Sequence, residues 1–392
     1  GRPDIAYAVE RLVNAAAREL DIDPAELRRR NFIPPEAFPY KTPTGSTYEI
    51  ADLPGMLQKS LKLADWNGYA QRRAQSAAAG KLRGIGISTV IENTGAGQMA
   101  DEVEITLDAS GIVTVHTVAK AQGHGHETTY GLIVAKALGL PLERVRIVQC
   151  LPGMTIKGNH TGGSRSTVGA GSVCHLAAQK LIEHGKALAA LEMKLEPSQI
   201  SYAEGVFSSA QSTQRMELAA LAKSKAITLK ADGTFGSTFP NGCHIVEVEI
   251  DADTGVTEVV SYCAVDDCGE VIHHAIVEGQ LHGGILQGAG QVFGEHVVYD
   301  RESGQPLAAS FMDYAMPRAG LIPEVRGDEH PTPSKISPLG VKGVGESGCT
   351  ASIPVLVGAV LDALRPLGIP HLDMPLTPAK VWQAISDARA KS

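Results

Sequence analysis

The stretch of residues 244–267 reads HIVEVEIDADTGVTEVVSYCAVDD, with apolar and polar side chains alternating on both sides of Asp253-Thr254-Gly255. Alternation with a period of two is typical of a strand with one buried face, and a short Gly-containing turn between two such runs indicates a hairpin. We therefore predict an antiparallel hairpin here. A loop follows, and then a long helix around residues 275–295, AIVEGQLHGGILQGAGQVFGE.

An earlier stretch has the same order of elements. Residues 102–118 alternate around the turn at Asp108–Gly111, a loop rich in glycine and histidine follows, and residues 126–140 have a helical pattern. Hairpin, loop and helix thus occur twice, which predicts an α+β fold of two related lobes with the loops at their junction. Chance similarity of two common motifs is the alternative.

The remaining elements are mainly helical. Residues 5–20 have apolar side chains at helical spacing, and Asp23-Pro24 is typical of an N-cap followed by a first helical residue. Residues 51–80 predict two helices, and Thr377-Pro378 predicts the start of a last one. Because the chain begins GRPD and enters a helix at once, we expect a fragment of a longer polypeptide.

Composition excludes several classes of partner. The 392 residues carry a net charge of −8 without a basic block, so nucleic acid and membrane surfaces are not predicted partners. We see no run approaching the ~18 apolar residues of a membrane helix and no export signal, and we expect a cytoplasmic protein. The six cysteines form no C-x-x-C pair, so neither an iron–sulfur cluster nor structural zinc is predicted within this chain.

Glycine is abundant, with 42 residues, and it clusters in short segments. The loops Thr161–Thr167 and Gly343–Gly348 each precede a predicted helix, where free backbone N–H groups favour an anion. Neither loop matches a Walker or dinucleotide motif, and for each one alone a tight turn is the competing interpretation. Together with Gly123–Gly125, they favour a large polar cofactor bound mainly by backbone.

Glu346 stands alone among small residues in Val-Gly-Glu-Ser-Gly. A carboxylate at this place would be partly desolvated, which raises its pKa toward that of a useful general base. A glutamate that caps the following helix explains the same pattern. The residues themselves leave both interpretations open.

Histidines offer weaker candidates. His124, His126 and Glu127 lie in QGHGHETT, and H-x-H can bind zinc, although no further ligand stands at a recognisable spacing. His273-His274 is expected to cap or pack against the helix that follows. No G-x-S-x-G nucleophile motif is present.

Four motifs resemble the large-subunit signatures of the xanthine dehydrogenase, aldehyde oxidase and carbon monoxide dehydrogenase family. They are TGGSRST (161–167), AVDDCGEVIHHAIVEGQLHGGILQGAGQVFGE (264–295), FMDYAMPRA (311–319) and PLGVKGVGESG (338–348). The opening residues resemble the end of the first cofactor-binding half of that subunit, so the resemblance extends in order over nearly the whole chain.

The resemblance implies a molybdenum ion held by molybdopterin, in bacteria often as the cytosine dinucleotide. It also implies 2Fe-2S and FAD groups on other domains or subunits. Because the cofactor would hold the metal, no metal ligand from this chain is expected. The implied partners are those domains or subunits, a missing N-terminal half of the large subunit and a small-molecule substrate, in a complex that is expected to be a dimer.

The resemblance also assigns roles to residues. Glu346 would be the general base for oxidation of a substrate with water as the oxygen source. The implied cofactor contacts are Gly123, His124, Gly125, Gly163, Ser164, Arg165, Ser166, Gln287, Gly343 and Gly345. The family usually has glutamine where this chain has His124, so that contact is expected to differ.

The implied organisation has three segments. Residues 1–80 would be the end of the first cofactor-binding half with a helical connection, 81–240 the first lobe of the second molybdopterin-binding domain, and 241–392 its second lobe. The substrate would be an aldehyde, an N-heterocycle or of the carbon monoxide type, with a preference for the first two, and the fragment by itself is expected to be inactive. A non-catalytic binding or assembly module with the same fold is the alternative.

Overall fold

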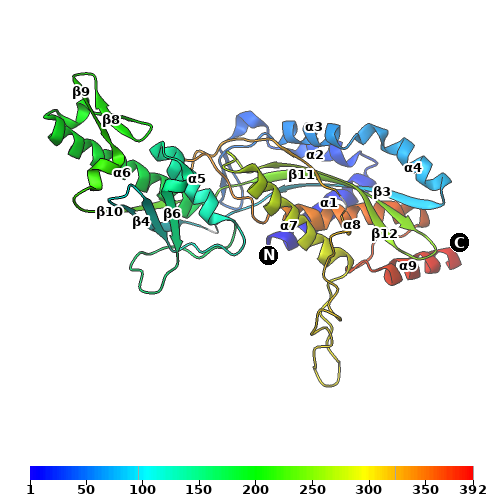
Figure 1. The fold of residues 1–392 in the computed structure, drawn as a ribbon. Helices are drawn as coiled ribbons and strands as arrows, with labels where there is room; N and C mark the ends of the chain where they lie inside the picture. Colours follow the sequence, from blue (N-terminus) through cyan, green and yellow to red (C-terminus); the bar gives the residue numbers. More distant parts are fainter. Residues whose placement is uncertain (96, 323, 392) are drawn as a thin grey trace.

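The predicted hairpin at 244–267 forms the centre of the larger of two lobes in the computed structural model, which describes residues 1–95, 97–322 and 324–391 (Figure 1). Strands β11 (Asn241–Asp251) and β12 (Thr257–Asp267) pair antiparallel. Strand β3 (Lys81–Ile91) pairs antiparallel with β11, and β13 (Arg326–Glu329) pairs parallel with β12. The sheet order is therefore β13-β12-β11-β3.

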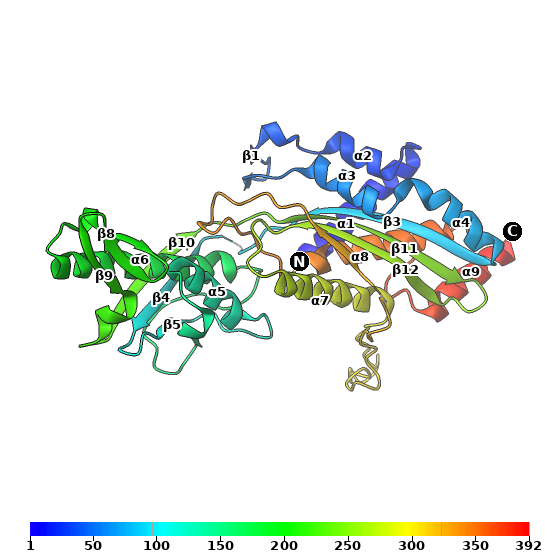
Figure 2. The same cartoon turned by 45° about the horizontal axis from the view of Figure 1, so that its top comes forward.

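Helices cover both faces of this sheet (Figure 2). On one face lie α2 (Pro24–Asn31), α3 (Leu53–Leu63) and α4 (Tyr69–Ala78), and on the other lie α1 (Arg2–Glu19), α7 (His274–Phe293), α8 (Ser347–Leu364) and α9 (Pro378–Lys391). Alternation along β11 divides its side chains between two cores. Cys243 and Ile245 pack with α3, whereas Val246, Val248 and Ile250 pack with α7 and α8.

The smaller lobe contains the earlier hairpin. Strands β4 (Met99–Leu107) and β5 (Val113–Thr117) pair antiparallel, β6 (Val145–Gln149) pairs parallel with β5, and β10 (Ile227–Phe235) pairs with β4. The Asp108 carboxylate accepts hydrogen bonds from the N–H groups of Ser110 and Ile112, which fixes the turn. Helices α5 (His126–Leu138) and α6 (Ser172–Met193) pack on this sheet, and β7 (Ser201–Ala203), β8 (Val206–Ser209) and β9 (Ser212–Glu217) form a small sheet beyond them.

The predicted order of hairpin, loop and helix is confirmed in both lobes. In each, an antiparallel hairpin leads to a helix, then to a strand parallel to the second hairpin strand, and then through a glycine-rich loop to a long helix. The two sheets differ in the fourth strand, which pairs with the first strand of each hairpin. In the smaller lobe this strand is β10, which comes after the shared elements along the chain. In the larger lobe it is β3, which comes before them.

Helix starts also agree with the sequence. The Asp23 side chain accepts hydrogen bonds from the N–H groups of Ala25 and Glu26, and Thr377 accepts one from Lys380. His273 caps α7 by accepting a hydrogen bond from the Ile276 N–H. Residues 31–50 include two short paired strands, β1 (Tyr40–Lys41) and β2 (Thr47–Tyr48).

Strand β3 does not belong to the lobe that was predicted to begin at residue 81. Strand β3 was expected to begin the first lobe, but it pairs along its whole length with β11 of the second lobe. Helix α8 also packs closely along β3, where Gly84 and Gly86 leave no room for a Cβ against the helix backbone. The chain therefore contributes a strand to the larger lobe before it enters the smaller one.

One helix has the length and composition of a membrane span, although the sequence was predicted to contain no apolar run of that length. An 18-residue window within Ser347–Leu367 has a mean hydropathy of 1.6, but 89% of this window is buried within the protein. Because α8 lies between the sheet, α1 and α7, its apolar composition is that of a core helix.

Candidate functional site

A cavity of about 330 Å³ lies between the two lobes, where loops from both of them meet. The smaller lobe lines it with residues 161–167 and with parts of the segment 122–129. The larger lobe lines it with residues 341–346 and with side chains of α7 and the segment before it. The loops are thus at the junction of the lobes, as the sequence predicts.

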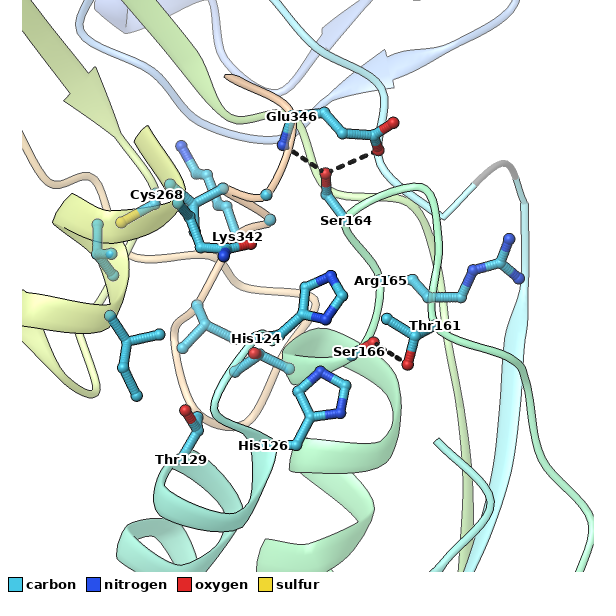
Figure 3. Close-up of a pocket in the computed structure, with 18 of the residues that line it drawn as sticks. His124, His126, Thr129, Thr161, Ser164, Arg165, Ser166, Cys268, Lys342 and Glu346 are labelled. Atoms are coloured by element: carbon cyan, nitrogen blue, oxygen red, sulfur yellow. Dashed lines mark hydrogen bonds between the residues drawn. The ribbon is translucent and has the colours of Figure 1, made fainter. Parts of the chain in front are cut away.

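Gly163 and Ser164 shape the first loop, because both have positive φ angles, +65° and +55°. The Gly163 carbonyl accepts a hydrogen bond from the Gly95 N–H at 2.8 Å. The Arg165 side chain donates to the Gly162 carbonyl at 2.7 Å, so its guanidinium folds back on the loop. Figure 3 shows Ser164 directed toward Glu346.

The second loop is anchored below the cavity by Lys342. Its buried ammonium group donates to the Asp267 carboxylate at 2.6 Å, to the Thr332 hydroxyl at 2.8 Å and to the Ile50 carbonyl at 3.0 Å. Gly343 then passes so close to the first loop that a Cβ there would collide with the Ser164 carbonyl oxygen. The two glycine-rich loops are therefore in direct backbone contact.

Glu346 is at the N-cap position of α8, but its side chain makes no capping hydrogen bond. The carboxylate instead accepts a hydrogen bond from the Ser164 hydroxyl at 3.1 Å, and the Glu346 N–H donates back to that hydroxyl, also at 3.1 Å (Figure 3). An ion pair with Arg2 completes its contacts. The geometry therefore favours a site role for this carboxylate over side-chain capping.

Glu92, which we did not single out from the sequence, is the desolvated carboxylate of the site. It follows β3, its side chain is 1% exposed, and it pairs with Arg2 at 2.7 Å. Burial raises its pKa to about 7, Arg2 acts against this, and the nearby charge of Glu346 adds to it. The Glu346 side chain is 45% exposed, so it is only partly desolvated, and much less so than that of Glu92.

Arg2 and Ser164 connect the two carboxylates. The guanidinium bonds to both Glu92 and Glu346, and the Ser164 hydroxyl lies 3.4 Å from one Glu92 oxygen. The Ser347 hydroxyl donates to the other Glu92 oxygen at 3.2 Å. The only signal for Glu92 in the sequence is a single acidic residue between an apolar strand and a glycine-containing loop.

Replacing Glu92 with Gln is expected to reduce the pH dependence of stability between pH 4.5 and pH 7. A pKa raised from 4.5 to about 7 means that the folded state binds this proton more tightly. The resulting stability is fully present below pH 4.5 and is lost as the pH rises through 7. The shift corresponds to roughly 3 kcal/mol, which urea unfolding of both proteins across this range would measure. Glu278→Gln, at an exposed carboxylate, is the control, and a Glu92→Gln profile parallel to that of the unaltered protein would contradict the expectation.

The histidines form a stack rather than a metal site. His124 and His126 lie 5.3 Å apart between ring centroids, and His126 stacks on Tyr130 at 5.0 Å. The Gln122 N–H donates to Nδ1 of His124, which leaves Nε2 as its protonated nitrogen when the ring is neutral. Burial lowers the pKa of His126 to about 4, with His124 contributing. Within the described residues, no group of three or more His, Cys, Asp or Glu side chains could hold a metal ion.

Most of the site residues named from the sequence lie at this cavity. Those that line it are His124, Gly163, Ser164, Arg165, Ser166, Gln287, Gly343, Gly345 and Glu346. Gly123 and Gly125 instead form the turn before α5, with φ angles of +94° and +69°. Gln280, which the sequence did not indicate, also lines the cavity, and a Cβ at Gly345 would lie 3.3 Å from its Oε1.

Comparison with known proteins identifies a family. A model described as "Molybdopterin cofactor-binding domain" matches residues 59–323. The carbon monoxide dehydrogenase large chain of Hydrogenophaga pseudoflava is 33% identical over 98% of this chain and 51% of its own length.

Two solved structures resemble the fold closely. Reconstituted carbon monoxide dehydrogenase from Oligotropha carboxidovorans aligns with a TM-score of 0.92 at 31% identity, over all of this chain and 52% of that one. Quinoline 2-oxidoreductase from Pseudomonas putida 86 aligns with a TM-score of 0.90 at 32% identity, over 97% of this chain and 52% of that one. The chain thus spans about half the length of the relatives that it matches.

Proposed function

Because the chain belongs to the molybdopterin cofactor-binding domain family found in large subunits of carbon monoxide dehydrogenases, xanthine dehydrogenases and aldehyde oxidoreductases, we propose that it is the C-terminal part of a molybdenum hydroxylase large subunit. The observation that carries this proposal is the contact of two glycine-rich loops, one from each lobe, around a cavity with Glu346 at its edge.

The residues at the cavity fit a large polar cofactor. Hydroxyl groups of Thr161, Ser164 and Ser166 and backbone of both loops line it, and they suit a ligand with many hydrogen-bonding atoms. Gly343 allows the two loops to approach each other, because any side chain there would collide with the Ser164 carbonyl oxygen. The two loops would hold molybdopterin, with or without a cytosine nucleotide, and Gln287 would lie toward its metal end.

The bound cofactor would supply the oxidation chemistry, and the chain would supply a proton acceptor and orientation. Glu346 would take a proton from the oxygen that attacks the substrate, and its carboxylate is kept in place by the Ser164 hydroxyl. Arg2 pairs with both Glu346 and Glu92, and the charge of Glu346 raises the pKa of Glu92.

We propose further that the two lobes arose by duplication of one α+β unit. Support comes from the shared order of hairpin, helix, parallel strand, glycine-rich loop and helix in each of them. The two loops that contact the same cavity would then be equivalent parts of a duplicated unit.

The substrate would be small, of the aldehyde, N-heterocycle or carbon monoxide type. The carbon monoxide dehydrogenase and the quinoline 2-oxidoreductase are about equally similar to this chain, so similarity does not favour one substrate type over the other. Iron–sulfur and flavin domains or subunits would carry the electrons away, and the complex would act in the cytoplasm.

Metal and pterin analysis of the full-length protein would test this function. We expect about one molybdenum and one pterin per large subunit, since the cavity would hold a single cofactor. Gly343→Ala is expected to lower both contents, because the added Cβ would push apart the two loops that make the site. Gly327→Ala, where a Cβ would meet nothing within 4 Å, is the matched control.

Full-length protein without molybdenum would contradict the proposal and favour a non-catalytic assembly module. Equal molybdenum in the two glycine variants would contradict the assignment of the site. A melting curve for each variant separates loss of cofactor from loss of fold.

A further inference from the structure

The segment between α7 and β13 forms an arm that projects away from the larger lobe. Both views show residues after α7 leaving the body of the protein and returning toward the sheet (Figures 1 and 2). We define the arm as residues 296–322. It includes the segment FMDYAMPRA at 311–319, to which the cavity gives no role.

The arm exposes an unusual number of large apolar side chains. Phe311 is 88% exposed and Met312 is 93% exposed. The other exposed apolar side chains of the arm are Val297, Val298, Tyr299, Leu307 and Met316. Single exposed apolar residues are ordinary, but seven of them on one projecting segment indicate a surface that another surface covers.

Hydrogen bonds give the arm a defined shape. The Leu307 N–H donates to the Val298 carbonyl at 2.8 Å, and the Asp300 N–H donates to the Gln305 carbonyl at 2.8 Å, so the outer part is a hairpin. At its base, the Tyr314 hydroxyl donates to Glu295 at 2.9 Å. A segment with its own hairpin and a fixed base is suited to bind without large rearrangement.

We propose that this arm docks on the part of the large subunit that lies outside this chain. The inference rests on the proposed function, in which the chain is about half of that subunit. The family match, residues 59–323, includes the whole arm, and the relatives are about twice as long as this chain. In these relatives the same polypeptide therefore contains a further part of similar length, and this part is the partner that we assign to the arm.

Tethering favours this partner over a second copy or a separate subunit. A partner within the same polypeptide is present at a high effective concentration from synthesis onward. An arm with Phe311 and Met312 in water would otherwise promote association of the newly made protein. Docking of the arm would also connect α7, which carries Gln280 and Gln287, to the other half of the subunit.

Photo-cross-linking in the full-length complex would test the proposal. p-Benzoylphenylalanine is placed at position 311, and cross-linked peptides are identified by mass spectrometry after irradiation. We expect the main product to join the arm to a peptide of the same large subunit that lies outside residues 1–392. Position 191, an exposed leucine on α6 of the smaller lobe, is the control and is expected to give a much lower yield of that product.

Three outcomes would overturn the docking inference: a main cross-link to a separate subunit, a main cross-link to a second copy, or equal yields from positions 311 and 191. Phe311→Ser gives an independent measurement. It is expected to lower the melting temperature of the full-length protein more than Leu191→Ser does, and equal effects would count against docking. Molybdenum content of the same samples separates this result from failure of the proposed function.

Discussion

In the full-length protein with the proposed cofactor bound, Glu346→Gln is expected to abolish turnover while molybdenum content stays unchanged. The amide keeps nearly the same size and can still accept the hydrogen bond from Ser164, but it cannot take up a proton at neutral pH. Loss of a positioned general base costs ~10²–10⁴-fold in rate, so kcat should fall by at least ~10²-fold. Steady-state kinetics together with metal analysis would measure both quantities.

Two further variants make this test specific. Glu278→Gln removes an exposed carboxylate on α7, and it should leave kcat unchanged. Glu92→Gln should change the pH profile of kcat, because Glu92 and Glu346 share Arg2. A near-normal kcat for Glu346→Gln, with normal molybdenum content, would show that Glu346 is not the base.

The difference between Glu346 and Glu92 shows what a single sequence can reveal about this site. Glu346 could be found because its neighbours, glycines and a helix start, are also its neighbours along the chain. Glu92 and Arg2 reach the same site from 254 and 344 residues away, so no local pattern includes them. Their convergence depends on β3 pairing with β11 and on α1 packing against α8.

The same distinction explains the prediction of the fold. The two hairpins were predictable because each has its partner strand within a short turn, and alternation defines the buried face. Strand β3 is followed directly by the chain of the smaller lobe, but its partner residues in β11 lie 150 to 170 positions further on. The prediction from its neighbours along the chain therefore placed β3 in the smaller lobe, whereas it belongs to the sheet of the larger lobe.

Lys342→Met is expected to be the most destabilising of the single substitutions considered. The ammonium group of Lys342 and the carboxylate of Asp267 are both buried and lie 2.6 Å apart. Methionine fills a similar volume but leaves the buried Asp267 charge without its cation. Loss of one partner from a buried ion pair costs ~3–5 kcal/mol, a large fraction of the stability of most proteins.

Urea unfolding of Lys342→Met should therefore show a much lower free energy of unfolding than that of Lys335→Met, which removes an exposed lysine from the same segment. The double variant Lys342→Met/Asp267→Asn should recover part of the loss, because the amide is uncharged and its oxygen can still accept from the N–H groups of Gly269 and Thr332. If Lys342→Met fell within ~0.5 kcal/mol of Lys335→Met, the ion pair would not be a main anchor of the loop. Because Lys342 directly precedes Gly343, the same variant should also lower molybdenum content in the full-length protein, through displacement of the loop that contacts Ser164.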